Sequence, residues 1–132
     1  MKKERRLYSR LDTDICGTLY KDGVEIPIRI KDISERGIGI EIKEKDIPTD
    51  WKVNKKECFT VSFYDDSTPG LDIVKNKLNQ CDFDTVYIKK SNNTIYIGGK
   101  LVEDEYNYVD YVASKKANRF IARVKYMDFA RA

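Results

Sequence analysis

The sequence predicts a mainly β fold, an antiparallel β-barrel of six short strands followed by a C-terminal α-helix. Two hairpin turns, Asp22-Gly23 and Asn92-Asn93, are each flanked by strand-like runs. Apolar and polar residues alternate along the first half of the chain, as in strands with one buried face. Near the end, apolar residues recur at helical spacing instead. We therefore expect a closed or nearly closed barrel with one covering helix.

The strands are predicted from this alternation and from the turns that bound it. Between residues 24 and 31, valine or isoleucine stands at every second position. Pro27 lacks an N–H for a ladder hydrogen bond, so an edge or a bulge is expected there. A second alternating run begins at Ile38, and Trp51 is expected to fold back onto the core. The predicted strands are residues 15–20, 24–31, 38–42, 57–64, 85–90 and 94–102.

Residues 65–84 are the least regular part of the chain. Ser67-Thr68-Pro69 resembles a helix start, with proline in the first turn. Leu71, Val74 and Leu78 follow at helical spacing, so a short helix is expected in this segment.

The last strand and the C-terminal helix complete the domain. Gly98-Gly99 indicates a bulge or a close approach of the backbone, and Asp104 or Asn107 is the expected helix cap. The apolar stripe of the helix is predicted on Val109, Ala113, Phe120, Val124 and Met127, flanked by Val112, Ala117 and Ile121. We expect a single domain, 1–132, with a flexible arginine-containing arm (1–13), the barrel (14–102) and the helix (103–132).

Composition argues against an enzyme and against a metal site. The chain has 132 residues, 41% of them apolar, and a net charge of +3, which permits an anionic ligand without requiring a polyanion. It contains no histidine, the commonest general base and metal ligand. No phosphate-binding loop, nucleophile elbow or metal-spaced cluster is present. We therefore expect a non-catalytic protein without a metal or cofactor.

The expected compartment is the cytoplasm. The three cysteines, Cys16, Cys58 and Cys81, are widely spaced and odd in number, which favours reduced thiols over disulfides or zinc. No apolar run approaches the roughly 18 residues of a membrane span. Met1 is followed by charged residues without the apolar segment of a secretory signal.

Two short motifs carry the candidate binding chemistry. RRLYSR at 5–10 has the pattern RRxxxR, and DISERG at 32–37 has the pattern DxSxxG at a strand-to-strand corner. Arginine binds phosphate oxygens or the guanine O6/N7 edge with a planar fork, and it stacks on purines. An aspartate accepts hydrogen bonds at neutral pH and so suits the N1–H and N2–H2 groups of guanine. Glycine lets a ligand approach the backbone.

Together the motifs resemble those of the PilZ domain family. The resemblance extends to the isoleucine-rich strand after Gly37, to Trp51 after a loop, to the Gly98-x-x-Leu101 strand and to the C-terminal helix. It departs from the family at Leu101, where an aromatic residue is common, and in the length of the 65–84 segment and of the helix. The resemblance implies a six-stranded barrel that binds cyclic di-GMP in the cytoplasm of a bacterium.

The resemblance also implies a role for each motif residue. Arg6 and Arg10 would clamp phosphates and guanine edges, with a further contact from Arg5, which the family associates with uptake of a stacked ligand pair. Asp32 and Ser34 would read a guanine edge, and Gly37 would shape the turn. The implied ligand-binding residues are Arg5, Arg6, Arg10, Asp32, Ser34 and Gly37.

The leading functional hypothesis is a receptor that orders its arm on binding cyclic di-GMP and signals to a protein partner. The process would be motility, exopolysaccharide or biofilm control, and the protein a monomer or a ligand-linked dimer. The alternative is a degenerate PilZ-like interaction module that binds no nucleotide. A nucleic-acid-binding barrel is disfavoured by the modest charge of +3 and by the lack of an aromatic stacking platform.

Overall fold

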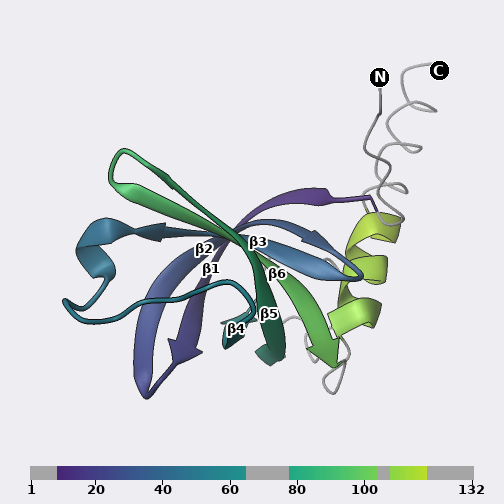
Figure 1. Cartoon of the computed structure of the whole chain (residues 1–132). Helices are drawn as coiled ribbons and strands as arrows, with labels where there is room; N and C mark the ends of the chain where they lie inside the picture. The colour runs from purple at the N-terminus through teal and green to yellow at the C-terminus, as the bar shows by residue number, and fades with distance from the viewer. Residues whose placement is uncertain (1–8, 65–77, 104–107, 119–132) are drawn as a thin grey trace, which may run out of the picture.

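A closed antiparallel barrel is the centre of the structure (Figure 1). The computed structural model describes residues 9–64, 78–103 and 108–118. In these ranges six strands close in the order β1-β2-β3-β6-β5-β4. The elements are β1 Leu11–Lys21, β2 Val24–Ser34, β3 Gly37–Lys43, the 3-10 turn η1 Glu44–Asp46, β4 Cys58–Tyr64, β5 Leu78–Ser91 and β6 Thr94–Glu103. Residues 108–118 form an α-helix, so the predicted fold class is confirmed.

Tight turns connect β1 to β2 and β5 to β6, as predicted. Asp22 and Gly23 both have positive φ, 55° and 77°, and Asn92 has φ 55°. Such values suit two-residue hairpin loops, whose twist matches that of the flanking strands. β1 begins at Leu11, which pairs with Ile33, so the last residues of the expected arm already belong to the barrel.

The inward faces of the strands form the core. In β2 and β4 the buried residues alternate as predicted, whereas in β3 Gly39 is buried along with Ile38 and Ile40, and Pro27 precedes the β2–β3 ladder, which begins at Arg29. The close approach predicted at Gly98-Gly99 is confirmed, since a Cβ on Gly99 would lie 2.7 Å from the Phe59 ring. The fully buried strand residues are Leu19, Ile26, Ile30, Ile33, Ile42, Val61, Phe83 and Ile97.

The helix covers one end of the barrel (Figure 1). Tyr108 and Val112 are fully buried, and the Tyr108 ring meets Phe83 edge-on with ring centres 5.4 Å apart. Within the described residues the predicted apolar stripe does not match the buried face, because Ala113 of the stripe is exposed and Val112, predicted to flank it, is fully buried. The buried Tyr108 phenol sets which face of the helix meets the barrel. The stripe positions beyond residue 118 and the expected caps lie outside the described residues.

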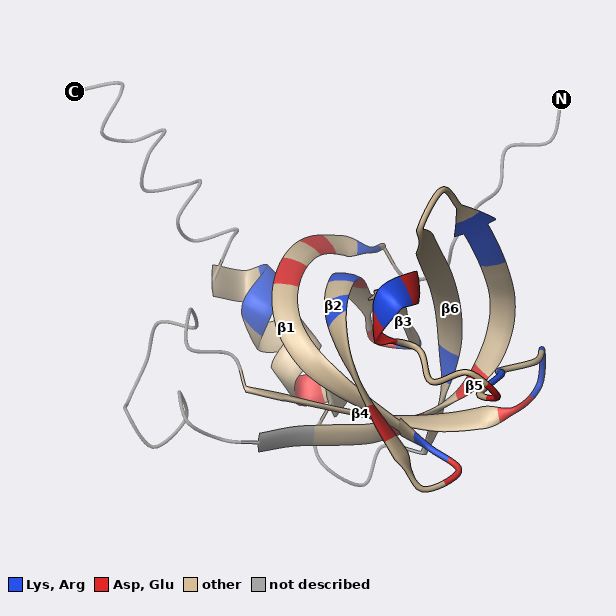
Figure 2. Cartoon of the chain, turned by 90° about the vertical axis from the view of Figure 1, so that its left-hand side faces the viewer, with Lys and Arg blue, Asp and Glu red and all other residues tan. Residues whose placement is uncertain are grey.

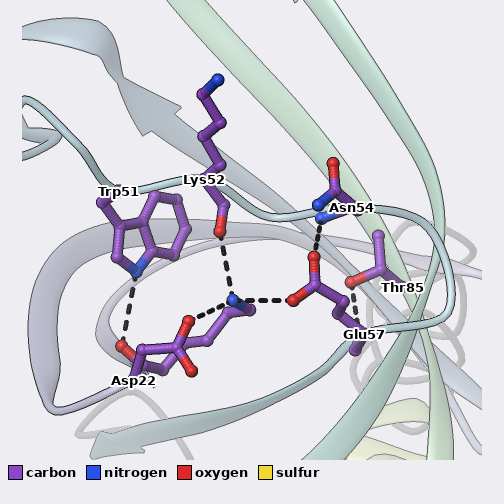
Figure 3. Close-up of polar contacts among 7 residues, drawn as sticks. Asp22, Trp51, Lys52, Asn54, Glu57 and Thr85 are labelled. Carbon is purple, nitrogen blue, oxygen red and sulfur yellow. Dashed lines mark hydrogen bonds and ion pairs between the residues drawn. The ribbon is translucent and has the colours of Figure 1, made fainter.

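The segment between η1 and β4 lies on the side of the barrel away from the helix (Figure 1), and its polar contacts are drawn in Figure 3. Trp51 packs against the core, as predicted, and its Nε1–H donates to the Lys21 carbonyl at 3.3 Å. The Lys21 side chain is only 5% exposed, and its ammonium contacts Asp22, Glu57 and the Lys52 carbonyl. The hydrogen bond to Asp22 raises the pKa of Lys21 despite burial. This charge is therefore neutralised within the structure.

One predicted element needs correction. The sequence predicted that residues 78–84 end an irregular segment containing a short helix. They belong instead to strand β5. Leu78 pairs with Tyr64 across the β4–β5 ladder, and this pairing overrides its helical spacing from Leu71 and Val74. The rest of the expected helix lies outside the described residues. Among those described, no helix has the length and apolar character that crossing a membrane requires.

Candidate ligand-binding site

The two sequence motifs meet on the outside of the barrel. Arg10 immediately precedes β1, and Asp32 lies near the end of β2. The Arg10 Nη1 and Asp32 Oδ1 atoms are 3.6 Å apart, and the two side chains are 35% and 22% exposed. A cation and a carboxylate are thus held together where a ligand can reach them. Arg5 and Arg6 lie outside the described residues.

The corner predicted at 32–37 is a tight hairpin between β2 and β3. Ser34 lies directly opposite Gly37, with Glu35 and Arg36 forming the turn. Ser34 is buried, and its Oγ accepts a long hydrogen bond, 3.4 Å, from the Arg36 N–H. A Cβ on Gly37 would lie 2.5 Å from the Gly99 carbonyl oxygen. Gly37 therefore lets β3 and β6 approach, and the Ser34 hydroxyl supports the turn.

A bulge in β2 turns Asp32 outward. The β2–β3 register shifts between Ile30 and Asp32, so Lys31 is the extra residue. Because Ile30 points into the core, regular alternation would direct Asp32 inward as well. Instead its carboxylate lies over Gly39, where a Cβ would overlap it. Sequence reasoning missed Gly39, although a glycine at an outward position between two buried isoleucines indicates such a close approach.

The C-terminal helix touches both motifs. The Tyr108 hydroxyl donates to the Gly37 carbonyl at 2.6 Å. The Lys116 ammonium donates to the Ser9 carbonyl at 2.7 Å and to both Glu35 carboxylate oxygens, at 2.8 and 2.9 Å. The helix thereby connects the arm to the β2–β3 turn. Sequence reasoning missed these two helix residues because neither belongs to a local motif.

The Lys116–Glu35 pair makes a pH-dependent contribution to stability. Burial raises the pKa of Glu35, but the hydrogen bond and charge of Lys116 lower it further, so the pKa falls below its ordinary 4.5. The pair therefore stabilises the fold above about pH 4.5, and this contribution is lost as the pH falls through the folded-state pKa. We expect Lys116→Met to lower the free energy of unfolding at pH 7 by about 1 kcal/mol and to flatten its acid dependence, measured by urea denaturation.

The matched control for that substitution is Lys90→Met. Lys90 pairs with Glu44 at 3.0 Å, but both side chains are well exposed. Its replacement should leave both the stability at pH 7 and the acid dependence close to those of the wild type. Identical pH profiles for Lys116→Met and the wild type would show that Lys116 does not hold Glu35.

Charges of both signs are distributed over the barrel. Figure 2 shows basic and acidic residues interspersed along the strands and turns. The described ranges contain no group of three or more cysteine, aspartate or glutamate side chains placed to hold a metal ion. The Arg10–Asp32 pair, rather than a broad basic surface, is thus the feature that characterises this site.

Comparison with known proteins gives one family. The sequence model of the PilZ domain matches residues 4–98, a span that includes both motifs. No curated protein matches the chain.

Solved structures show the same fold. The Bacillus subtilis inhibitor of motility (MotI/DgrA) superposes with a TM-score of 0.69 at 12% identity, covering 91% of this chain and 53% of that one. The PilZ domain of Escherichia coli YcgR with c-di-GMP gives 0.64 at 14% identity, covering 92% and 97%. A YcgR complex with c-di-GMP gives 0.53 at 12%, covering 97% and 49%. The chain thus spans about half the length of the MotI chain and of the longer YcgR chain.

Proposed function

The chain belongs to the PilZ domain family, and on that premise we propose that it is a non-catalytic receptor for cyclic di-GMP. The observation that carries the proposal is the pairing of Arg10 with Asp32, which brings the two motifs together on one exposed surface. The PilZ domain of YcgR, which shares the fold, was solved with that ligand.

The chemistry of the pair suits a guanine nucleotide. The Asp32 carboxylate can accept from guanine N1–H and N2–H2, two donors on one edge. The Arg10 guanidinium can bind a phosphate or the guanine O6/N7 edge in bidentate fashion. At 3.6 Å the Arg10–Asp32 contact is longer than a good charge-assisted hydrogen bond, so a ligand can replace it at modest cost.

The proposed output is a change in the arm that a protein partner senses. Arg5 and Arg6 would close over the ligand together with Arg10, and the binding energy would offset the cost of ordering the arm. Ser9, at the end of the arm, is held by Lys116 of the helix, so a change in the arm would reach the helix directly. We propose a cytoplasmic adaptor that controls motility, exopolysaccharide synthesis or biofilm formation.

Titration calorimetry with cyclic di-GMP tests the proposal. We expect saturable binding, with the heat giving both the affinity and the number of ligands per chain. At about 100 times the dissociation constant, the ligand should add about 2.7 kcal/mol to the free energy of unfolding, seen as a higher thermal midpoint. Cyclic di-AMP is the control, because adenine lacks the edge donors that Asp32 would accept. If neither heat nor a thermal shift is observed, the proposal fails and the alternative, an interaction module that binds no nucleotide, is favoured.

A further inference from the structure

A groove crosses the outer surface of the barrel over β1, β4 and β5. Its volume is about 580 Å³, which is within the range of small-ligand sites. Arg10 and Asp32 lie at the opposite ends of β1 and β2 from the residues that line it. The groove is therefore separate from the candidate site described above.

One row of side chains crosses the groove over four neighbouring strands. Glu25 of β2 is opposite Tyr20 of β1, and Tyr20 is opposite Thr60 of β4. Thr60 is in turn opposite Asp82 of β5, and its hydroxyl donates to the Asp82 carboxylate at 2.6 Å. The row therefore carries one aromatic ring and two carboxylates, and one of these carboxylates is held by a neighbouring hydroxyl.

A second row runs beside the first. Thr18 of β1 is opposite Ser62 of β4, and Ser62 is opposite Gln80 of β5. Leu19 and Val61 are fully buried, so the residues on either side of them along β1 and β4 face outward. The two rows thus share one outer face of the sheet.

The sizes of the side chains explain the hollow. Serine and threonine occupy the middle of the two rows, and all three of these residues are half-buried. Longer side chains stand on both sides of them. Tyr20, which is 48% exposed, and Glu25 form one wall, and Gln80 and Asp82 of β5 form the other. The groove therefore has a floor of hydroxyl groups between polar walls.

The lining excludes two classes of ligand. The residues around the groove, all of them in the described ranges, include two carboxylates and no lysine or arginine, so phosphates and other anions would be repelled. They include no aliphatic side chain either, which disfavours an apolar ligand. Five of the seven lining residues carry a hydroxyl or an amide, groups that both donate and accept hydrogen bonds. The lining therefore suits a neutral ligand with many hydroxyl groups.

We propose that this groove binds a neutral saccharide. A sugar ring has hydroxyl groups around its edge and C–H groups on its faces. The Tyr20 ring would lie against one face, while the Asp82 and Glu25 carboxylates and the Gln80 amide bind the hydroxyls. The hydrogen bond from Thr60 already positions Asp82, and sites built on strands are held more precisely than sites on loops. Barrels of a different fold, the OB-fold, also bind oligosaccharides on a strand face.

Nuclear magnetic resonance titration of the full chain tests this proposal. The probes are the neutral tetrasaccharides cellotetraose, maltotetraose, mannotetraose and N-acetylated chitotetraose, each added to millimolar concentration. At least one of them should shift the backbone amide signals of Thr18, Tyr20, Thr60 and Ser62 in a saturable way. Tetragalacturonate is the anionic control, and it should bind more weakly than the neutral probe because the groove contains carboxylates without a cation.

Substitutions in the walls of the groove locate the binding. Tyr20→Ala should weaken binding of the saccharide about 2- to 10-fold, the range of one aromatic contact, and Tyr20→Phe should bind better than Tyr20→Ala. Asp82→Ala should weaken it about 10-fold or more, because it removes a charged acceptor. Tyr64→Ala is the matched control, since Tyr64 is an exposed tyrosine on β4 that does not line the groove. Urea denaturation checks that each variant keeps the fold.

The outcomes separate this proposal from other occupants and from the receptor function. The proposal is wrong if no neutral tetrasaccharide shifts these amide signals, or if Tyr20→Ala and Asp82→Ala bind the saccharide as the wild type does. If only a triarginine peptide shifts them, the carboxylates select a cationic protein segment and the saccharide is excluded. Binding of cyclic di-GMP should be unchanged in Tyr20→Ala and Asp82→Ala, so failure of either proposal leaves the other standing.

Discussion

Tyr108→Ala is expected to lower the free energy of unfolding by about 3–5 kcal/mol, the range for removing a large aromatic side chain from a core. Tyr108 is fully buried, and its ring packs edge-on against Phe83. Its hydroxyl also donates to the Gly37 carbonyl at 2.6 Å. The substitution therefore removes both the apolar contact and the hydrogen bond that join the helix to the barrel. Urea denaturation measures the loss, and helix ellipticity reports whether residues 108–118 remain folded.

Tyr108→Phe isolates the hydroxyl. It keeps the ring and leaves the Gly37 carbonyl without this donor, so the loss should be about 1–3 kcal/mol. Burial is the main cause that raises the pKa of Tyr108 well above 10. The phenol therefore stabilises the fold below about pH 10, and this contribution is lost as the pH rises through the folded-state pKa. Tyr108→Phe should lack that alkaline loss. A Tyr108→Ala variant as stable as the wild type would contradict the packing of the helix on the barrel.

The strands that alternate regularly were predictable because one buried face requires period two. β4 follows the alternation from end to end, and the hairpin at Asp22-Gly23 has the backbone angles that its residues favour. The bulges at Lys31 and Val86 were not predictable. A bulge is defined by the partner strand, and a single sequence does not contain the register of that partner.

The candidate site was predictable only as far as its local motifs. Asp32 and Gly37 stand in one short pattern, and the structure brings Arg10 to the same place. Gly39 lies on the neighbouring strand and meets Asp32 only through the β2–β3 register, which a single sequence does not contain. Gly98-Gly99 indicated a close backbone approach without showing which side chain would occupy the space.

Asp32→Ala is expected to weaken cyclic di-GMP binding at least about 100-fold, if the proposed function holds. The carboxylate would accept two guanine donors, and each hydrogen bond to a charged group is worth about 1.5–3 kcal/mol. Gly39→Ala should also weaken cyclic di-GMP binding, although it does not remove the carboxylate. A Cβ at Gly39 would overlap the Asp32 carboxylate, which must then move away from this position. Calorimetry with cyclic di-GMP measures both effects.

The fold should survive Gly39→Ala because the group that must move is the end of a flexible side chain on the outer surface. Asp14→Ala is the matched control. It removes an exposed carboxylate from the neighbouring strand β1, where Asp14 pairs with Arg29 at 2.8 Å, and should bind as the wild type does. If Asp32→Ala and Gly39→Ala also bind as the wild type does, the carboxylate does not read the ligand. If only Gly39→Ala binds normally, the carboxylate reads the base from a position away from Gly39.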